Sequence, residues 1–219
     1  NKMVTTKELF DLSHSIAGEY LSRYEYPWQA LKGIKDLILT LGPTLEGYEE
    51  VSEHVWVHPT AKVAPTAYLG APCIIGPETE VRHCAFIRGS ALVGAGCVVG
   101  NSVELKNVIL FDGVQTPHYN YVGDSILGYK SHMGAGSITS NVKSDKKNVV
   151  VKNGTEQMET GIRKMGAMLG DFVDVGCNSV LNPGTVVGRR CIIYPTSCVR
   201  GVVPEDTIFK APGKLAHRE

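Results

Sequence analysis

The stretch 57-VHPTAKVAPTAYLGAPCIIGPETEVRHCAFIRGSALVGAGCVVGNSVEL-105 places an apolar residue at every sixth position. Nine successive hexads begin with Val57, Val63, Leu69, Ile75, Val81, Ile87, Val93, Val99 and Leu105. A helix repeats every 3.6 residues and a strand every two, so neither element alone explains this period. It predicts a solenoid in which each hexad forms one side of a three-sided prism and turns one apolar residue into a continuous core.

A second set of residues, mostly small, follows four positions after each of these key residues. It comprises Ala61, Ala67, Cys73, Thr79, Ala85, Ala91, Cys97, Val103 and Ile109. Small side chains at these positions would let the corners of the prism turn tightly. Glycine often follows the key residue directly, as at Gly70 and Gly76, and there we expect a sharp bend with positive φ. The pattern returns later at Leu169, Val175, Leu181, Val187, Ile193 and Val199.

The pattern divides the chain into three parts. Residues 1–50 read as an N-terminal α-helical cap, with a plausible helix N-cap at Thr5 or Thr6 and a stop at Gly42-Pro43. We expect this helical hairpin to cover the open first coil, whose core and backbone would otherwise be exposed. Residues 51–206 form the solenoid, and residues 207–219 form a C-terminal tail.

The repeat is interrupted twice. We expect the period to fail from Phe111 to Tyr121 and to resume at Val122, with one residue deleted before Leu127. A second, charged insertion covers about residues 142–168. Interruptions of a rigid repeat are common places for binding and chemistry, so both are regions in which functional residues can be sought.

Composition narrows the functional classes. The chain has 22 basic and 22 acidic residues, so no basic field suggests a nucleic acid partner. No apolar run reaches the roughly 18 residues of a membrane span, so we expect no membrane partner. The six cysteines show no CxxC spacing, and three of them, Cys73, Cys97 and Cys191, occupy small corner positions. Buried free thiols fit a reducing compartment, and we expect a cytoplasmic protein without a metal site.

Two features suggest chemistry, each with a plain structural alternative. His118 lies among two tyrosines and an asparagine, where an imidazole could act as a general base or be an ordinary loop side chain. Arg88 and Lys106 each follow a key residue and are 18 positions apart, which is one full coil. Their stacked charges could bind a phosphate or carboxylate, or could be solvated surface charges.

Three motifs in order make the pattern specific: Val103–Asn107 (VELKN), His118–Asp124 (HYNYVGD) and Gly134–Asn141 (GAGSITSN). Their sequence and spacing resemble the acetyltransferase half of the bifunctional enzyme N-acetylglucosamine-1-phosphate uridyltransferase/glucosamine-1-phosphate acetyltransferase. The resemblance implies a left-handed parallel β-helix, a homotrimer with sites between subunits, and acetyl-CoA as co-substrate. The specific likeness covers about a quarter of the chain, and the generic hexapeptide repeat covers most of the rest.

The resemblance also implies roles for individual residues. The match to His118 is the general base that deprotonates the sugar amine. The matches to Arg88 and Lys106 bind the sugar phosphate, and those to Tyr121 and Asn141 bind the sugar. His132 stands where the family has a further sugar-binding asparagine. For the coenzyme half, the resemblance points to Cys177, near the CoA thiol, and to Lys214 in the tail segment Ala211-Pro212-Gly213-Lys214, near the CoA phosphates.

The function expected is therefore acetyl transfer from acetyl-CoA to an amino group of a phosphorylated or nucleotide-linked sugar. Residues 1–50 contain no Gly-rich nucleotide loop, so we do not expect the family's nucleotidyltransferase activity in these 219 residues. The alternatives are an O-acyltransferase for another sugar, or a non-catalytic sugar-nucleotide sensor or scaffold. A zinc carbonic anhydrase of the same fold would need three histidines, and the spacing of His83, His118 and His132 does not favour it.

Overall fold

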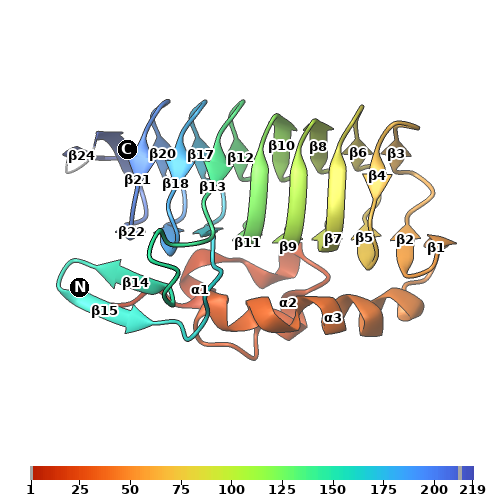
Figure 1. The fold of residues 1–219 in the computed structure, drawn as a ribbon, viewed down its shortest axis with the longest axis horizontal. Helices are drawn as coiled ribbons and strands as arrows, with labels where there is room; N and C mark the ends of the chain where they lie inside the picture. The colour runs from red at the N-terminus through yellow and green to blue at the C-terminus, as the bar shows by residue number, and fades with distance from the viewer. Residues whose placement is uncertain (1, 212–213) are drawn as a thin grey trace.

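The computed structural model describes residues 2–211 and 214–219 and shows a parallel β-helix with three faces. In Figure 1 the strands of the front face run downward and those of the rear face run upward, while the chain advances from right to left. The coil is therefore left-handed, as the resemblance implies and contrary to the usual preference for right-handed crossovers. Parallel pairing stacks each coil on the next at the ordinary strand spacing of about 4.8 Å.

The three faces take their strands in turn. The rear face contains β3 (Lys62–Val63), β6 (Glu80–Val81), β8 (Val98–Asn101), β10 (Gln115–His118), β12 (His132–Met133), β17 (Asp174–Val175), β20 (Ile192–Ile193) and β23 (Thr207–Ala211). The front face contains β4 (Tyr68–Leu69), the first halves of β7 (Phe86–Val93), β9 (Glu104–Leu110) and β11 (Tyr121–Leu127), and then β13 (Ile138–Thr139), β18 (Val180–Leu181) and β21 (Cys198–Val199).

The third side, here called the covered face, lies against the helices. It contains β2 (Val55–Val57), β5 (Cys73–Ile75), the second halves of β7, β9 and β11, and then β16 (Ala167–Leu169), β19 (Thr185–Val187) and β22 (Val202–Val203). The remaining strands form hairpins: β1 (Glu49–Ser52) pairs with β2, β14 (Val150–Asn153) with β15 (Glu156–Glu159), and β24 (Lys214–His217) with β23.

The core follows the hexad pattern. Key residues such as Ile75, Ile87 and Leu105 are fully buried, and so are the small corner residues Cys73 and Cys97. The period does not fail between Phe111 and Tyr121 as expected. Instead Thr116 takes the key position opposite Val99, is fully buried, and donates its hydroxyl to the carbonyl of Val98. The repeat is not recognisable here in the sequence because the residue at the key position is polar. Its hydroxyl finds a hydrogen-bond acceptor only on the neighbouring coil.

The glycines that follow key residues do not bend the chain through positive φ. At Gly76, for example, an added Cβ would lie 2.4 Å from the carbonyl oxygen of Gly94 on the next coil. Such a position excludes a side chain because two backbones pass closely. Positive φ occurs two positions further on, at residues such as Glu78, Cys84 and Ser90. The expectation of left-handed backbone at these glycines was therefore wrong.

The N-terminal segment forms short helices: α1 (Thr6–Leu9), α2 (Gly18–Leu21), α3 (Ile34–Leu41), and 3-10 helices at Leu12–His14, Pro27–Gly33 and Gly42–Thr44. Thr5 caps α1 through a capping box with Glu8, as the sequence predicts. The segment lies lengthwise along the covered face and not across the open end of the first coil (Figure 1). The placement expected for this cap was wrong because outward residues of the covered face are apolar and need a lid: Trp56, Ile74, Leu92, Ile109, Ile126, Met168 and Val186 are all buried.

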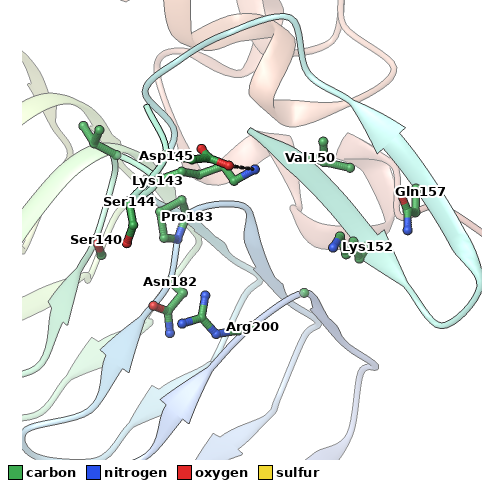
Figure 2. A pocket seen from close by; sticks show the side chains of 12 residues that line it. Ser140, Lys143, Ser144, Asp145, Val150, Lys152, Gln157, Asn182, Pro183 and Arg200 are labelled. Carbon is green, nitrogen blue, oxygen red and sulfur yellow. Dashed lines mark ion pairs between the residues drawn. The ribbon is translucent and has the colours of Figure 1, made fainter. Parts of the chain in front are cut away.

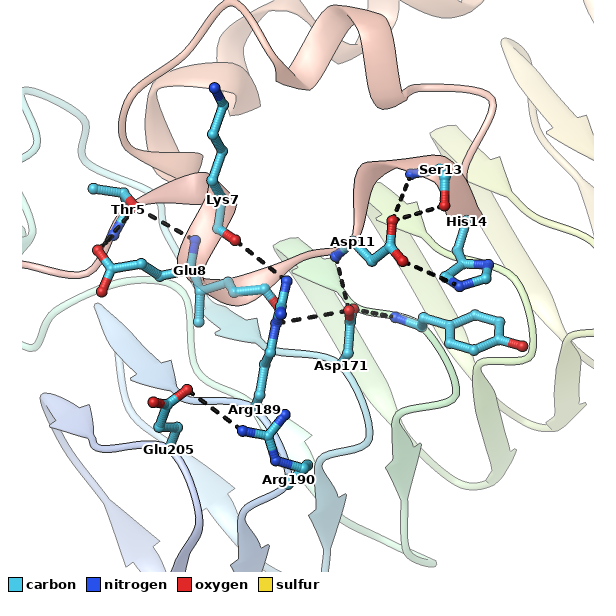
Figure 3. Close-up of polar contacts among 12 residues, drawn as sticks. Thr5, Lys7, Glu8, Asp11, Ser13, His14, Asp171, Arg189, Arg190 and Glu205 are labelled. Atoms are coloured by element: carbon cyan, nitrogen blue, oxygen red, sulfur yellow. Dashed lines mark hydrogen bonds and ion pairs between the residues drawn. The ribbon is translucent and has the colours of Figure 1, made fainter.

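Polar contacts attach this segment to the coils (Figure 3). The side chain of Asp171 accepts the backbone N–H of Asp11 at 2.8 Å and that of Tyr129 at 2.9 Å. Arg189 donates to the carbonyl of Leu9 at 3.0 Å. Burial raises the pKa of the Asp171 carboxyl, partly offset by these N–H donors. The helices are thus fixed to the prism and leave only the front and rear faces open.

Candidate functional site

His118 lies where the rear face turns into the front face, which we call the His118 corner. Its neighbour on the preceding coil is Asn101, and the two residues are in register. The close approach requires Gly100, where an added Cβ would lie 1.6 Å from the carbonyl oxygen of Pro117. His118 Nδ1 lies 3.4 Å from Asn101 Oδ1, and the imidazole is exposed. An amide oxygen can only accept, so this long contact favours a proton on Nδ1 and a free Nε2.

Asn120, which sequence reasoning missed, holds the turn that presents His118. Its side chain is buried, and its Nδ2 donates to the carbonyls of Gly134 and Ser137, each at 2.9 Å. Its Oδ1 accepts the backbone N–H of His118 at 3.2 Å. One amide therefore ties the turn to the next coil, which is the rigid support that a reacting group needs.

A second polar cluster lies at the opposite edge of the front face, which we call the Asp124 corner. Asp124 is almost fully buried and accepts from three side chains. Lys106 Nζ lies 3.0 Å from Oδ2, Asn107 Nδ2 lies 2.9 Å from Oδ1, and Asn141 Nδ2 lies 2.6 Å from Oδ2. The cluster joins three successive coils and includes two of the predicted site residues.

Tyr121 completes this cluster. Its hydroxyl accepts from Asn141 Nδ2 at 3.2 Å, and burial raises the pKa of the phenol, helped by the nearby Asp124 carboxylate. Gly123 makes room for the contact, because an added Cβ would lie 2.4 Å from the Tyr121 hydroxyl. The structure thus brings together Lys106, Tyr121 and Asn141, with the phenol kept neutral as a hydrogen-bonding group.

Arg88 and Lys106 do not form an open pair of cations. Arg88 binds Glu104 at 3.0 Å, and Lys106 binds Asp124 at 3.0 Å, each across one coil. A register shift between Ile87 and Gly89 places Lys106 opposite Gly89 and not opposite Arg88. The sequence identified Arg88 and Lys106 as candidate cations but did not identify the carboxylates that bind them. The signal that could have found Asp124 is its spacing of 17 residues from both Asn107 and Asn141.

His132 lies outside both clusters. It sits on the rear face in β12, and its Nδ1 is 2.9 Å from Asp174 Oδ1 on the next coil. The side chain is partly exposed. His132 is therefore part of an Asp–His pair on the open rear face, separate from the Asp124 cluster.

The two residues assigned to the coenzyme half lie in later coils. Cys177 is exposed at the His118 corner, two coils beyond His118. Backbone hydrogen bonds connect the coils at this corner. The N–H of Gly136 donates to the carbonyl of His118, and the N–H of Asn178 donates to the carbonyl of Ala135. Lys214 is exposed in β24, opposite Ala211. Pro212 and Gly213 of the tail motif lie outside the described residues.

Two classes of site find no support in residues 2–211 and 214–219. No group of three or more histidine, cysteine, aspartate or glutamate side chains there could hold a metal ion. No helix in that part of the chain is both long and apolar enough to cross a membrane.

The fold defines a hexapeptide-repeat protein, and sequence comparison identifies its relatives. Residues 72–157 match the family described as the GMPPB C-terminal domain. The chain is 34% identical over 106 residues to a bifunctional sugar-1-phosphate nucleotidylyltransferase/acetyltransferase of Sulfurisphaera tokodaii, covering 48% of this chain and 26% of that protein. It is 29% identical over 195 residues to the bifunctional protein GlmU of Caldanaerobacter subterraneus, covering 84% and 39%.

The chain is thus related to GlmU-type bifunctional proteins, which confirms the resemblance drawn from the three motifs. It spans only about a quarter of the length of the first relatives. Among solved structures, the acetyltransferase domain of PglB from Neisseria gonorrhoeae is 14% identical, with a TM-score of 0.35 over 84% of this chain and 65% of that one. A hexapeptide transferase family protein from Anaplasma phagocytophilum is also 14% identical, with a TM-score of 0.36 over 74% and 78%.

Proposed function

We infer that this chain transfers an acetyl group from acetyl-CoA to an amino group of a phosphorylated or nucleotide-linked sugar. The observation that carries this inference is the position of His118. It lies exposed on a corner that Asn120 fixes, across the front face from the polar cluster of Tyr121 and Asn141. A relative whose name includes acetyltransferase is 34% identical over 106 residues of the chain.

In the proposed reaction, the neutral sugar amine attacks the thioester carbonyl, and His118 Nε2 accepts the proton that the amine nitrogen loses. A C–N bond forms, the C–S bond breaks, and the proton passes from the imidazole to the departing thiolate. An ammonium group is no nucleophile, so the amine must react in its neutral form. A neutral imidazole suits this role because it can accept the proton that the nitrogen loses. The Asn101 contact favours the tautomer in which Nε2 is free to accept.

The residues proposed to bind the sugar and those proposed to bind acetyl-CoA lie at different positions along the prism. Tyr121, Asn141 and Lys106 would hold the sugar and its phosphate at the Asp124 corner, with Arg88 one coil earlier and His132 on the rear face. Cys177 and Lys214 would line the acetyl-CoA path in later coils. Replacing Lys214 with Ala should reduce the rise in melting temperature that acetyl-CoA produces, because ligands stabilise the folded state by mass action. Exposed Lys35 in α3 offers a matched control, Lys35→Ala.

We also propose a homotrimer with sites between subunits. The helices occupy the covered face, so contacts between copies would involve the front and rear faces. The front face carries an exposed aromatic pair, Tyr68 and Phe86, with ring centroids 5.7 Å apart. Light scattering should give three times the mass of one chain, and Phe86→Glu should weaken assembly. A monomeric wild-type protein at micromolar concentration would contradict the shared site. A cytoplasmic location stays a prediction.

The direct test measures acetylated product by mass spectrometry. Acetyl-CoA is incubated with glucosamine-1-phosphate or with a nucleotide-linked amino sugar, and the wild-type protein is compared with His118→Ala. Product from the wild type alone supports the proposal, and an acetyl ester on a hydroxyl would assign the O-acyltransferase alternative. A second candidate is a non-catalytic sugar-nucleotide sensor, in which the polar cluster of Tyr121 and Asn141 binds the sugar without a reaction. Binding of these sugars without any product from the wild type would select it.

A further inference from the structure

A cavity of about 450 Å³ lies beside the Asp124 corner, between the β14–β15 hairpin and the later coils (Figure 2). Its walls come from two sources. The insertion contributes Lys143 and Lys152, and the coils contribute Ser140, Asn182 and Arg200. The volume falls within the usual range for small-molecule sites, roughly 300–1,000 Å³.

Arg200 belongs to a column of cations along the front face. Like Arg88 and Lys106, it directly follows a key residue, here Val199. Those two side chains bind carboxylates on the next coil. Among the described residues, no ion pair or side-chain hydrogen bond involves either Arg200 or Lys152. Both line the cavity, so it carries two uncompensated positive charges.

The rest of the lining does not cancel this charge. Lys143 Nζ lies 3.5 Å from Asp145 Oδ2, so these two residues form a neutral pair. Ser140 and Ser144 add hydroxyl donors to the walls, whereas the Asn182 amide already donates to the carbonyl of Val199. Figure 2 shows the Arg200 guanidinium beside Asn182, facing the space below the hairpin. Cations with neutral donors are the combination that recognises phosphate.

The walls are held in place without a ligand. Val149 and Val151 at the base of the hairpin are fully buried. At Gly201, where φ is +70°, an added Cβ would lie 2.8 Å from the carbonyl oxygen of Lys152. At Gly184, where φ is +84°, it would lie 2.9 Å from Val149. The hairpin therefore packs directly on the coil backbone, and the cavity is preformed.

We propose that this cavity binds the phosphate group of a small phosphorylated ligand, with Arg200 and Lys152 as its cationic contacts. The inference does not depend on acetyl transfer, because it rests only on the cavity and its charges. Phosphate could come from a sugar nucleotide or from coenzyme A, and both carry a diphosphate. Ser140 directly precedes Asn141, so the cavity opens beside the residue proposed to bind the sugar.

Isothermal titration with inorganic pyrophosphate tests the site directly. The double variant Arg200→Gln/Lys152→Gln should bind about tenfold more weakly or worse, since it loses two charge-assisted contacts. Lys35→Gln removes one charge from exposed α3 and should bind like the wild type. Melting temperatures of all three proteins establish that they are folded. Acetyl transfer, measured separately with His118→Ala, can fail without affecting this result.

The same titrations with UDP-N-acetylglucosamine and with CoA identify the source. A matching loss for the sugar nucleotide assigns its diphosphate to the cavity, and a matching loss for CoA assigns the coenzyme. A loss seen for pyrophosphate alone still supports a phosphate site. Equal pyrophosphate affinity in the wild type and the double variant would overturn the proposal. So would a wild-type protein that binds none of the three ligands at millimolar concentration.

Discussion

His118 and Cys177 occupy the same corner of the prism, two coils apart, with only Ala135 between them in the column. At the ordinary strand spacing their backbones are about 10 Å apart. Both side chains are exposed. A ligand laid along this corner from the later coils would therefore pass Cys177 before it reached the imidazole.

Replacing His118 with Ala should lower kcat by about 10²–10⁴-fold, the usual scale for one general base. The melting temperature should barely change, because the side chain is exposed and does not fill the core. Wild-type activity should fall in acid, where a protonated imidazole cannot accept the amine proton. The matched control is His83→Ala, at another exposed histidine to which no site role is assigned. Near-normal turnover by His118→Ala would refute the mechanism and make His132 the next candidate.

Asp124→Asn should reduce the free energy of unfolding by about 1–3 kcal/mol, because Lys106 loses its carboxylate and the amide cannot accept at both positions. Glu104→Gln is the control: it breaks the more exposed pair with Arg88 and should cost at most about 1 kcal/mol. Urea denaturation measures both. Equal losses would show that the Asp124 cluster is no more than a surface ion pair.

Thiol labelling at pH 8 should modify Cys84, Cys177 and Cys198, which are exposed, and leave Cys73 and Cys97 unreacted. Burial raises the pKa of Cys73 and of Cys97 to about 12, so the reactive thiolate is scarce. Mass spectrometry of the labelled peptides gives the result. The raised pKa values also mean that the folded state holds these protons more tightly. Stability should therefore decline as the pH rises from about 9, the ordinary thiol value, towards 12.

Labelling also tests the coenzyme path. Alkylation of Cys177 should block activity if acetyl-CoA passes this corner, and acetyl-CoA should slow the alkylation. Cys177→Ala should stay active and resist inactivation by the reagent, which separates blockage from a chemical role. Cys198, exposed in β21 on the front face, provides the comparison thiol. Full activity after complete modification of Cys177 would remove it from the proposed path.

Asp171→Ala should loosen the helical segment from the prism. The change leaves the backbone N–H groups of Asp11 and Tyr129 without acceptors, at a cost of about 1–3 kcal/mol. Hydrogen exchange should accelerate around residues 9–14 but not in the central coils. Asp145→Ala, in an exposed loop, serves as control. Unchanged exchange in Asp171→Ala would mean that apolar packing alone holds the segment.

The sequence predicted the fold well because its core is periodic. A hexad needs only an apolar residue at one position and a small one at another, and both are visible without tertiary information. The pattern failed where a polar side chain took a core position, as at Thr116, whose hydroxyl finds an acceptor only once the coils stack. It also could not place the N-terminal helices. Their partner surface consists of residues such as Trp56 and Leu92, which look outward-facing in the repeat.

The sequence identified candidate site residues by their residue type and motif. It did not identify the residues that they contact in the folded protein. Lys106 and Asn141 were recognisable from their motifs, but Asp124, which binds both, is brought to them by coils one residue shorter than the rest. The pairing of His132 with Asp174 crosses the whole insertion, 42 positions along the chain. Such contacts depend on register, which a single missing residue changes for every side chain after it.

The two shortened coils have a lasting consequence for how this surface can vary. In these coils the chain turns at Asn107 and Asp124, where φ is +54° and +48°, as it does at Ser90 in the longer coil before them. Asparagine, aspartate and glycine tolerate that backbone better than other residues. The same two side chains hold the polar cluster. The turn and the polar cluster therefore depend on the same two residues, so a substitution at either one affects both. No such backbone demand applies to Lys152 in the insertion, where the surface can vary more freely.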